Sequence, residues 1–419
     1  ARPPVGGLMD EARRTADQEA ELAARTSYGR LLALLASRNG DIAACEDALA
    51  SALEAALLQW PHRGVPDNPV GWLITVARRS IGHATGREQT AHRGRDTLIL
   101  LDEERAAMTG TPFGDKRLEL MFVCAHPAID PEAQAPLMLQ TVLGLDAARI
   151  AASFLVSPTT MGQRLVRAKL RIRDCGIAFE LPDIEDAPAR LDSVLSAIYA
   201  AYGTAWEDVA GADTRLAELG EEAIWLGHLL SELMPQEPEV LGLLSLALHC
   251  EARRAARRSA DGAFVPLHRQ DTSLWVRPMI RKAEHLLRQA ATFAAPGRFQ
   301  TEAAIQSLHA HQRITGEQFS APLAHLYDHL ASIAPTTGGL VARAVAHAEN
   351  GAPQAALAML DAVADTGGYQ PWWAARARIC CLAHDAAAAR EAALTAAGLT
   401  SDAGVRQFLL GGGYAEKAD

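Results

Sequence analysis

The sequence is poor in cysteine and aromatic residues, and it has no long apolar run. None of its six cysteines forms a Cys-X-X-Cys pair, and such spacings are typical of zinc sites and disulfide frameworks. We therefore expect reduced thiols in a cytoplasmic protein that holds no metal and no cofactor. No stretch approaches eighteen uninterrupted apolar residues, so we expect no membrane-spanning helix. The first residues also lack the apolar core of a secretory signal.

Patterns that favour β-strands are equally scarce. Alternating runs of Val, Ile, Thr and Tyr are nearly absent, while Ala, Leu, Arg and Glu, which favour helices, dominate the 419 residues. Apolar residues recur at helical spacing, as at Leu49, Leu53 and Leu57. The sequence therefore predicts an all-α protein.

Three domains are predicted from the order of helices and linkers. In a first domain, residues 1–108, we expect helices near 20–37, 41–59 and 69–85. In a second domain, residues 115–179, we expect helices near 115–125, 131–143, 146–153 and 158–174. A third domain, residues 188–419, is helical throughout, and its paired Ala-rich helices with a period near 34 residues are typical of tetratricopeptide-like repeats.

The charge of the chain does not by itself favour a nucleic-acid-binding protein. The net charge is −10, with −3 in residues 1–185 and −7 in the remainder. Any contact with DNA must therefore come from a local basic patch. The sharpest patch is the segment 164–173, which carries five cations and no acid. Ser157 and Pro158 predict the start of its helix after a short turn, so 146–174 predicts a helix-turn-helix.

The five cations form two rows on that predicted helix. Arg164, Arg167 and Arg171 follow the spacing i, i+3, i+7, and Lys169 and Arg173 form a second row. A recognition helix needs such a set, because Arg and Lys neutralise phosphates and Arg reads guanine edges. A solvated basic face without a DNA partner is the alternative interpretation.

A second, weaker basic patch follows the third predicted helix. It consists of Arg78, Arg79, Arg87, Arg93 and Arg95, with Glu88 as the only acid among them. Gly82 and Gly86 lie among these cations and weaken a helix there. Trp72, nearly two turns earlier, is expected in the core rather than in base stacking.

Longer segments resemble a known family. Residues 28–79 (YGRLLALLASRNGDIAACEDALASALEAALLQWPHRGVPDNPVGWLITVARR) resemble region 2 of an extracytoplasmic-function (ECF) RNA polymerase sigma factor. DKRLELMFVCAHPAI and QRLVRAKLRIRDCGI resemble its region 4. The remainder resembles the tetratricopeptide-like extension of one ECF group, through PEVLGLLSLALHCEARR, SADGAFVPLHRQDTSLW and AAIQSLHAHQR.

The resemblance implies a transcription initiation factor whose partners are core RNA polymerase and promoter DNA. Region 2 would bind the β′ clamp helices and the −10 element, and region 4 would read the −35 element. The positions that match the clamp-binding helix are Glu46, Asp47 and Leu49. The positions that match the −10 segment are Arg78, Arg79 and Arg87. The positions on the −35 recognition helix are Arg164, Arg167 and Lys169. Arg171, which shares the first row with Arg164 and Arg167, is expected to contact DNA as well.

The chain departs from the family pattern in region 2. Ala50 and Ser51 stand where the family usually has Gln-Glu, and Ser80–Gly86 replaces a basic helix. These departures favour a second hypothesis, in which the sigma scaffold has become an enzyme or small-molecule binder of a biosynthetic pathway and no longer binds DNA.

Under this second hypothesis the ligand would lie in the extension or in an interdomain cleft. His309 would act as a general acid or base with Asp271 or Glu302 as its orienting partner, and Arg253 with Arg254 would clamp a carboxylate or phosphate. The alternatives are a core histidine at 309 and a salt-bridged helix end at 253. The sequence has no Gly-rich phosphate loop and no Gly-X-Ser-X-Gly or His-Glu-X-X-His motif.

Overall fold

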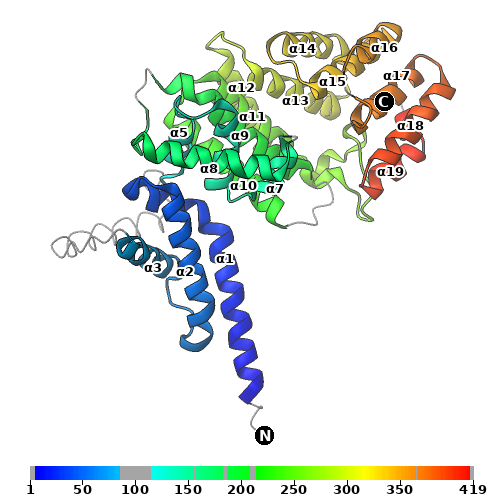
Figure 1. Ribbon diagram of the computed structural model, residues 1–419. Coiled ribbons are helices and arrows are strands. Elements are labelled where there is room, and N and C mark those ends of the chain that lie inside the picture. Colours follow the sequence, from blue (N-terminus) through cyan, green and yellow to red (C-terminus); the bar gives the residue numbers. More distant parts are fainter. Residues whose placement is uncertain are drawn as a thin grey trace. The chain divides into compact units, whose positions relative to one another are not determined.

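The computed structural model describes residues 5–84, 115–154, 156–182, 186–207, 214–364 and 366–415. These residues form helices joined by short connections (Figure 1), and their one element of β-pairing is a bridge between Arg258 and Phe264. The prediction of an all-α protein is confirmed. Within the described ranges, no helix combines the length and the apolar character needed to cross a membrane.

Contacts within the chain define two compact units, which we call unit 1 and unit 2. Unit 1 comprises residues 1–205 and 218–229, and unit 2 comprises residues 206–217 and 230–419. Unit 1 contains both of the first two predicted domains. The three-domain division at 1–108, 115–179 and 188–419 describes segments of sequence and stays a prediction.

The helices of unit 1 come first in the chain, and α9 and α10 extend into unit 2. They are α1 (Val5–Asn39), α2 (Ile42–Arg63), α3 (Pro69–Ala84), α5 (Arg117–Cys124), α6 (Pro131–Thr141), α7 (Ala147–Ser153), α8 (Pro158–Asp174), most of α9 (Ala187–Glu207) and the middle of α10 (Thr214–Leu233).

The remaining elements of unit 2 are α-helices and short 3₁₀ turns. They are α11 (Pro238–Glu251), η2 (Arg254–Arg257), η3 (Leu267–Arg269), η4 (Thr272–Leu274), α12 (Arg277–Ala291), α13 (Arg298–Thr315), α14 (Ser320–Ile333), α15 (Thr337–Glu349), α16 (Pro353–Asp361), α17 (Gln370–Leu382), α18 (Ala386–Leu399), α19 (Ala403–Leu410) and η5 (Gly413–Ala415).

Two helix starts follow from capping residues that the sequence displays. The side chain of Asn68 accepts a hydrogen bond from the backbone N–H of Gly71 at 2.9 Å, just before Pro69 opens α3. Ser157 accepts one from the N–H of Thr160 at 3.1 Å, just before Pro158 opens α8. Both predicted starts are confirmed, because a polar cap followed by proline fits the first turn of a helix.

The start of α1 was predicted wrongly, at about residue 20 instead of Val5. The early part of this helix buries Ala16, Ala20 and Ala23, whose exposed fractions are at most 6%. Alanine contributes little to a hydrophobic pattern, so a contact face made of alanines has a weak periodic signal.

Unit 1 has a core to which both of its sequence segments contribute. Leu32, Leu49 and Leu73 from α1, α2 and α3 are fully buried. Gly29 of α1 lies directly against the backbone of Val142, which follows α6. The first three helices and the end of α6 are therefore packed closely within unit 1.

A buried arginine ties α5 to α10 within unit 1. Arg117, 4% exposed, donates from Nε and Nη2 to the carboxylate of Asp115. The same guanidinium pairs with Glu222 and lies 4.3 Å from the ring centroid of Trp225. Burial of this cation is offset by the two carboxylates, as a buried charge requires.

In unit 2, a glutamate in the first turn of α11 caps the N-terminus of α13. Glu239 accepts hydrogen bonds from the backbone N–H groups of Phe299 and Gln300, at 2.8 and 3.0 Å. These N–H groups belong to the first turn of α13, where backbone N–H groups have no carbonyl acceptor within the helix. Gly242 permits this approach, because a Cβ there would lie 2.5 Å from the nitrogen of Gln300.

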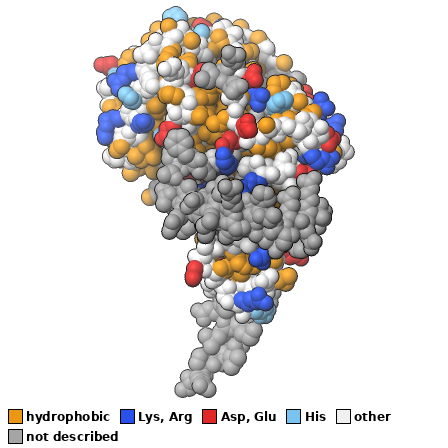
Figure 2. Space-filling model, turned by 90° about the vertical axis from the view of Figure 1, so that its left-hand side faces the viewer, with side chains coloured by type: hydrophobic (Ala, Val, Ile, Leu, Met, Phe, Trp, Pro, Cys, Tyr) orange, Lys and Arg blue, Asp and Glu red, His pale blue; other side chains and the backbone are white. Residues whose placement is uncertain are grey.

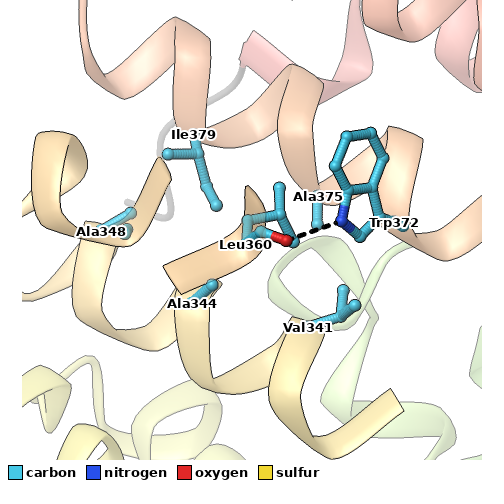
Figure 3. Close-up of a cluster of buried hydrophobic side chains, with 8 residues drawn as sticks. Val341, Ala344, Ala348, Leu360, Trp372, Ala375 and Ile379 are labelled. Carbon is cyan, nitrogen blue, oxygen red and sulfur yellow. Dashed lines mark hydrogen bonds between the residues drawn. The ribbon is translucent and has the colours of Figure 1, made fainter. Parts of the chain in front are cut away.

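The C-terminal helices of unit 2 pack consecutively on small residues. Figure 3 shows one such cluster, in which Val341 and Ala344 of α15 face Leu360 and residues of α17. The indole N–H of Trp372 donates to the carbonyl of Leu360 at 3.0 Å, so this buried polar group is satisfied. Alanines let these helices approach closely.

Replacing Gly29 with alanine tests the packing inside unit 1. The new Cβ would lie 1.8 Å from the carbonyl oxygen of Val142, so one backbone must move. We expect a loss of about 3 kcal/mol in unfolding free energy, measured by urea denaturation of the full chain. Gly203→Ala is the control, because its Cβ meets nothing within 4 Å and should stabilise α9 by about 0.5–1 kcal/mol. Equal stability of the Gly29 variant and the wild type would contradict the packing.

Candidate functional site

The helix α8 carries the strongest functional expectation, and its inner side is buried. Met161, Leu165, Ala168 and Ile172 are at most 5% exposed. They recur at helical spacing and pack α8 against α6 and α7. This apolar stripe fixes which side of the helix faces outward.

The outward side of α8 combines polar, cationic and apolar side chains. Gln163, Arg167 and Arg171 are exposed. Between them, Val166 and Leu170 are 57% and 38% exposed. The helix has no acid before Asp174 at its end, so the outward side attracts anions.

The first predicted row, Arg164, Arg167 and Arg171, is only partly committed to contacts inside the protein. Arg164 pairs with the exposed carboxylate of Glu132 at 2.7 Å. Among the described residues, Arg167 donates to the carbonyl of Gln163, one turn earlier on the same helix, and Arg171 donates to the carbonyl of Ala128 at 3.3 Å. Both Arg167 and Arg171 therefore keep an uncompensated charge.

The second row is directed toward α2. Lys169 is 9% exposed, and its Nζ lies 2.5 Å from Oε2 of Glu46. Arg173 lies 3.9 Å from Asp41 and 3.0 Å from Asp174. The expectations that Lys169 contacts DNA and that Glu46 contacts polymerase do not fit this arrangement, because the two groups neutralise each other.

Of the other two residues expected to bind polymerase, one lies on the surface and one in the core. Asp47 is exposed on α2. Leu49 is fully buried in the core, so its side chain supports α2 and does not face a partner. Leu57 and Leu58, which the sequence analysis did not select as contacts, are 47% and 66% exposed near the end of the same helix.

The residues expected to contact the −10 element lie at the end of α3. Arg79 is exposed and Arg78 is half-buried. Arg87 lies outside the described residues. The described part of this second patch thus offers one exposed cation, Arg79.

A pocket of about 360 Å³, open to solvent, lies where α2 leads into α3. Trp60 and Trp72 line it with their ring centroids 5.5 Å apart, in an edge-to-face arrangement. The indole N–H of Trp60 is buried and has no hydrogen-bond partner in the described structure. Arg63 and Asp67 lie at the same pocket. The sequence analysis missed this site, whose signal was the Trp-Pro turn at 60–61.

In unit 2, Arg253 lies in a cluster of arginines around Trp206. Arg257 is 3.7 Å from the centroid of the Trp206 ring, and Arg253 and Arg254 are 5.2 and 5.3 Å from it. Arg257 also donates to the carbonyl of Trp206 at 2.6 Å, and Arg254 pairs with Glu251. The salt-bridged helix end expected here is therefore at Arg254, and the indole face is already covered by cations.

His309 is half-buried on α13, near Arg253. Burial and the charge of Arg253 lower the pKa of His309 to about 4, so the imidazole is neutral at pH 7. Asp271 is exposed and caps η4 by accepting from the N–H of Ser273. No hydrogen bond among the described residues joins Asp271 to His309, and the expectation that they form an acid–base pair does not fit the geometry.

A further histidine, His249, lies inside unit 2. Its side chain is 1% exposed, and its Nε2 lies 3.4 Å from Glu284. Burial lowers the pKa of His249 to about 4 in spite of this carboxylate. In the described ranges, no group of three His, Cys, Asp or Glu side chains is arranged to hold a metal ion.

Figure 2 shows how the charges lie on one face of the molecule. The described Lys and Arg side chains form separate groups among apolar and acidic ones. This face has no continuous basic surface among the described residues, so a nucleic-acid contact depends on a local patch, as the net charge indicated.

Comparison with known proteins finds one relative over most of the chain. An uncharacterized protein of Rhizobium meliloti strain 1021, R00370, is 38% identical over 339 residues, which cover 79% of this chain and 80% of the relative. The chain belongs to the same family as R00370. A second match is to a family of unknown function, DUF6596, over residues 190–291. No solved structure matches the chain significantly.

The Glu46–Lys169 pair offers a direct test of how α8 is held. Replacing Glu46 with Gln leaves Lys169 without its carboxylate, and we expect a loss of about 2 kcal/mol in unfolding free energy. The charge swap Glu46→Lys with Lys169→Glu should recover most of this loss in a double-mutant cycle measured by urea denaturation. Glu132→Gln is the control, because Glu132 is 67% exposed in its pair with Arg164 and should cost under about 0.5 kcal/mol. Equal effects of Glu46→Gln and Glu132→Gln would disprove a buried pair.

Proposed function

We propose that the protein is a DNA-binding transcription initiation factor of the ECF sigma class, in which α8 enters the major groove. The observation that carries the proposal is the outward side of α8. It follows a short helix and a Ser157-capped turn, and it exposes Gln163, Arg167 and Arg171 without a neighbouring acid. A helix-turn-helix protein binds DNA with such a surface on its second helix.

Each type of side chain on this surface has a matching group in the major groove. Gln163 lies in the first turns of α8, where recognition helices contact base edges, and an amide pairs with adenine. Arg167, one turn further on, has the guanidinium that pairs with guanine. Val166, which is 57% exposed, suits the methyl group of thymine. Arg164 and Arg171, at the edge of this surface, are placed for phosphates.

The surface of α2 supports the polymerase part of the proposal. Leu57 and Leu58 are exposed, and Asp47 lies earlier on the same helix. Large apolar side chains exposed together on a helix favour a protein partner. We assign this surface to the clamp helices of core polymerase, with Leu57 and Leu58 as contacts and Leu49 as core support.

The pocket between α2 and α3 supports contact with an unpaired base. Of its two tryptophans, Trp72 is half-buried and offers aromatic surface to the pocket, while Trp60, 2% exposed, packs edge-to-face against it. Unstacked bases bind to aromatic rings and present acceptors at their edges. Arg63 would meet the phosphate of the same nucleotide. Under the proposal this pocket receives a base of the −10 element.

A catalytic function is supported less well. No hydrogen bond among the described residues joins His309 to Asp271, whose carboxylate caps η4. Binding of a small molecule near Arg253 remains compatible with a sigma factor, since it concerns unit 2 and not α8.

DNA binding is tested by fluorescence anisotropy with duplex DNA over a range of salt concentrations. In the double variant Arg167→Gln/Arg171→Gln, two exposed cations of α8 are lost. We expect the affinity to fall by about tenfold or more, and the slope of log K against log salt to become shallower by about 2.

Two controls separate phosphate contact from base reading. Arg167→Lys/Arg171→Lys retains the charges but not the guanidinium fork, so it should keep affinity for random duplex and lose discrimination among sequences. Arg14→Gln removes an exposed cation of α1 and should change neither. Full affinity in the Arg167→Gln/Arg171→Gln variant would rule out α8 as the DNA-binding element.

Polymerase binding is tested by capture of purified bacterial core RNA polymerase on the immobilised full chain at low salt. We expect Leu57→Arg/Leu58→Arg to abolish capture, because two cations would replace the apolar contact. Leu394→Arg is the control, since Leu394 is 54% exposed on α18. If the wild type fails to capture polymerase at micromolar concentration, the protein is not a sigma factor.

A further inference from the structure

Arg253 in unit 2 is a cation with hydrogen-bonding capacity that the protein does not use. Its Nη2 donates to Oε1 of Gln306 at 2.6 Å and contacts Sγ of Cys250 at 3.8 Å. Its Nε and Nη1 donate to none of the described residues, and no carboxylate in the described ranges forms an ion pair with it. Since a guanidinium has five N–H donors, most of those of Arg253 remain available.

Besides the arginines around Trp206, two neutral donors lie in the region of this cation. His309 lies on α13 one turn after Gln306, which brings it to the same side of the helix. The charge of Arg253 and burial lower the pKa of His309 to about 4, so its ring carries one N–H and no charge at pH 7. Tyr327 on α14 packs in one apolar cluster with Ile305 and Leu308 of α13, and burial raises the pKa of its hydroxyl to about 12. Neither ring makes a hydrogen bond with the described residues.

The carboxylates near Arg253 form ion pairs or hydrogen bonds with other side chains. Glu302, one turn before Gln306, pairs with Arg298 at 2.9 Å. Glu349 pairs with Arg378, and Glu284 accepts from the hydroxyl of Ser307 at 2.5 Å. Each of these acids has another donor, and none of them forms an ion pair with Arg253.

We propose that Arg253, His309 and Tyr327 bind a small oxyanion, the carboxylate or phosphate group of a metabolite. A guanidinium fork matches two oxygens of such a group, and charge-assisted bonds of this kind are strong. His309 and Tyr327 supply N–H and O–H donors without adding charge. Gln306 is a positioning residue, because its carbonyl oxygen fixes the orientation of Arg253.

This site does not depend on the proposed DNA binding. Arg253 lies in the segment 190–291 that matches DUF6596, whereas α8 lies outside it. Loss of anion binding would leave the assignment of α8 untouched, and loss of DNA binding would leave this site untouched.

The test uses NMR of the full chain with ¹³C-labelled histidine. The sample is titrated with inorganic phosphate in one arm and with acetate in the other, at constant ionic strength. The variant His309→Asn identifies the resonance of His309. We expect a saturable shift of that resonance in at least one arm, and the arm that responds identifies phosphate or carboxylate as the ligand group.

Arg253→Gln should raise the dissociation constant about tenfold or more. The matched control Arg277→Gln, which removes an exposed cation of α12, should leave it within about twofold. Absence of any shift in both arms up to tens of millimolar overturns the proposal, and so does an unchanged dissociation constant in folded Arg253→Gln. If that variant does not fold, the wild-type titration alone decides.

Discussion

The ion pair between Lys169 and Glu46 determines which side of α8 can meet a partner. The two residues are 123 positions apart, and their charged atoms are 2.5 Å apart. A lysine that is 9% exposed needs a carboxylate, because an uncompensated buried charge is costly. With Lys169 held against α2 and the apolar stripe held against α6 and α7, the side that includes Gln163, Arg167 and Leu170 faces outward.

The same pairing explains how a basic helix fits an acidic chain. Of the five cations in 164–173, Arg164, Lys169 and Arg173 each lie within 4 Å of a carboxylate. Within the part of the chain that the structure describes, Arg167 and Arg171 bind backbone carbonyls and no carboxylate. A count of charges along the sequence therefore overstates the electrostatic attraction of this helix for DNA. Its specificity would depend more on Gln163, Arg167 and the apolar side chains between them.

Local features could be predicted from the sequence, and features formed by distant residues could not. The caps at Asn68 and Ser157 act within one turn, so the starts of α3 and α8 were predicted correctly. The Lys169–Glu46 pair, the burial of Leu49 and the pocket at Trp60 depend on helices packed from different segments. The motif around His309 suggested a catalytic pair, but the position of Asp271 at a 3₁₀ cap depends on a loop path that periodicity does not encode.

The proposed function requires a conformational change in unit 1. Promoter elements at −10 and −35 are about 25 base pairs apart, or about 85 Å of duplex. A protein that reads both, with α3 at one and α8 at the other, cannot keep Glu46 of α2 in contact with Lys169 of α8. Opening would break a charged pair that contributes about 2 kcal/mol and the close contact of Gly29 with Val142. Core polymerase binding on α2 would have to supply this energy, so the interaction that orients α8 also opposes promoter binding until polymerase is present.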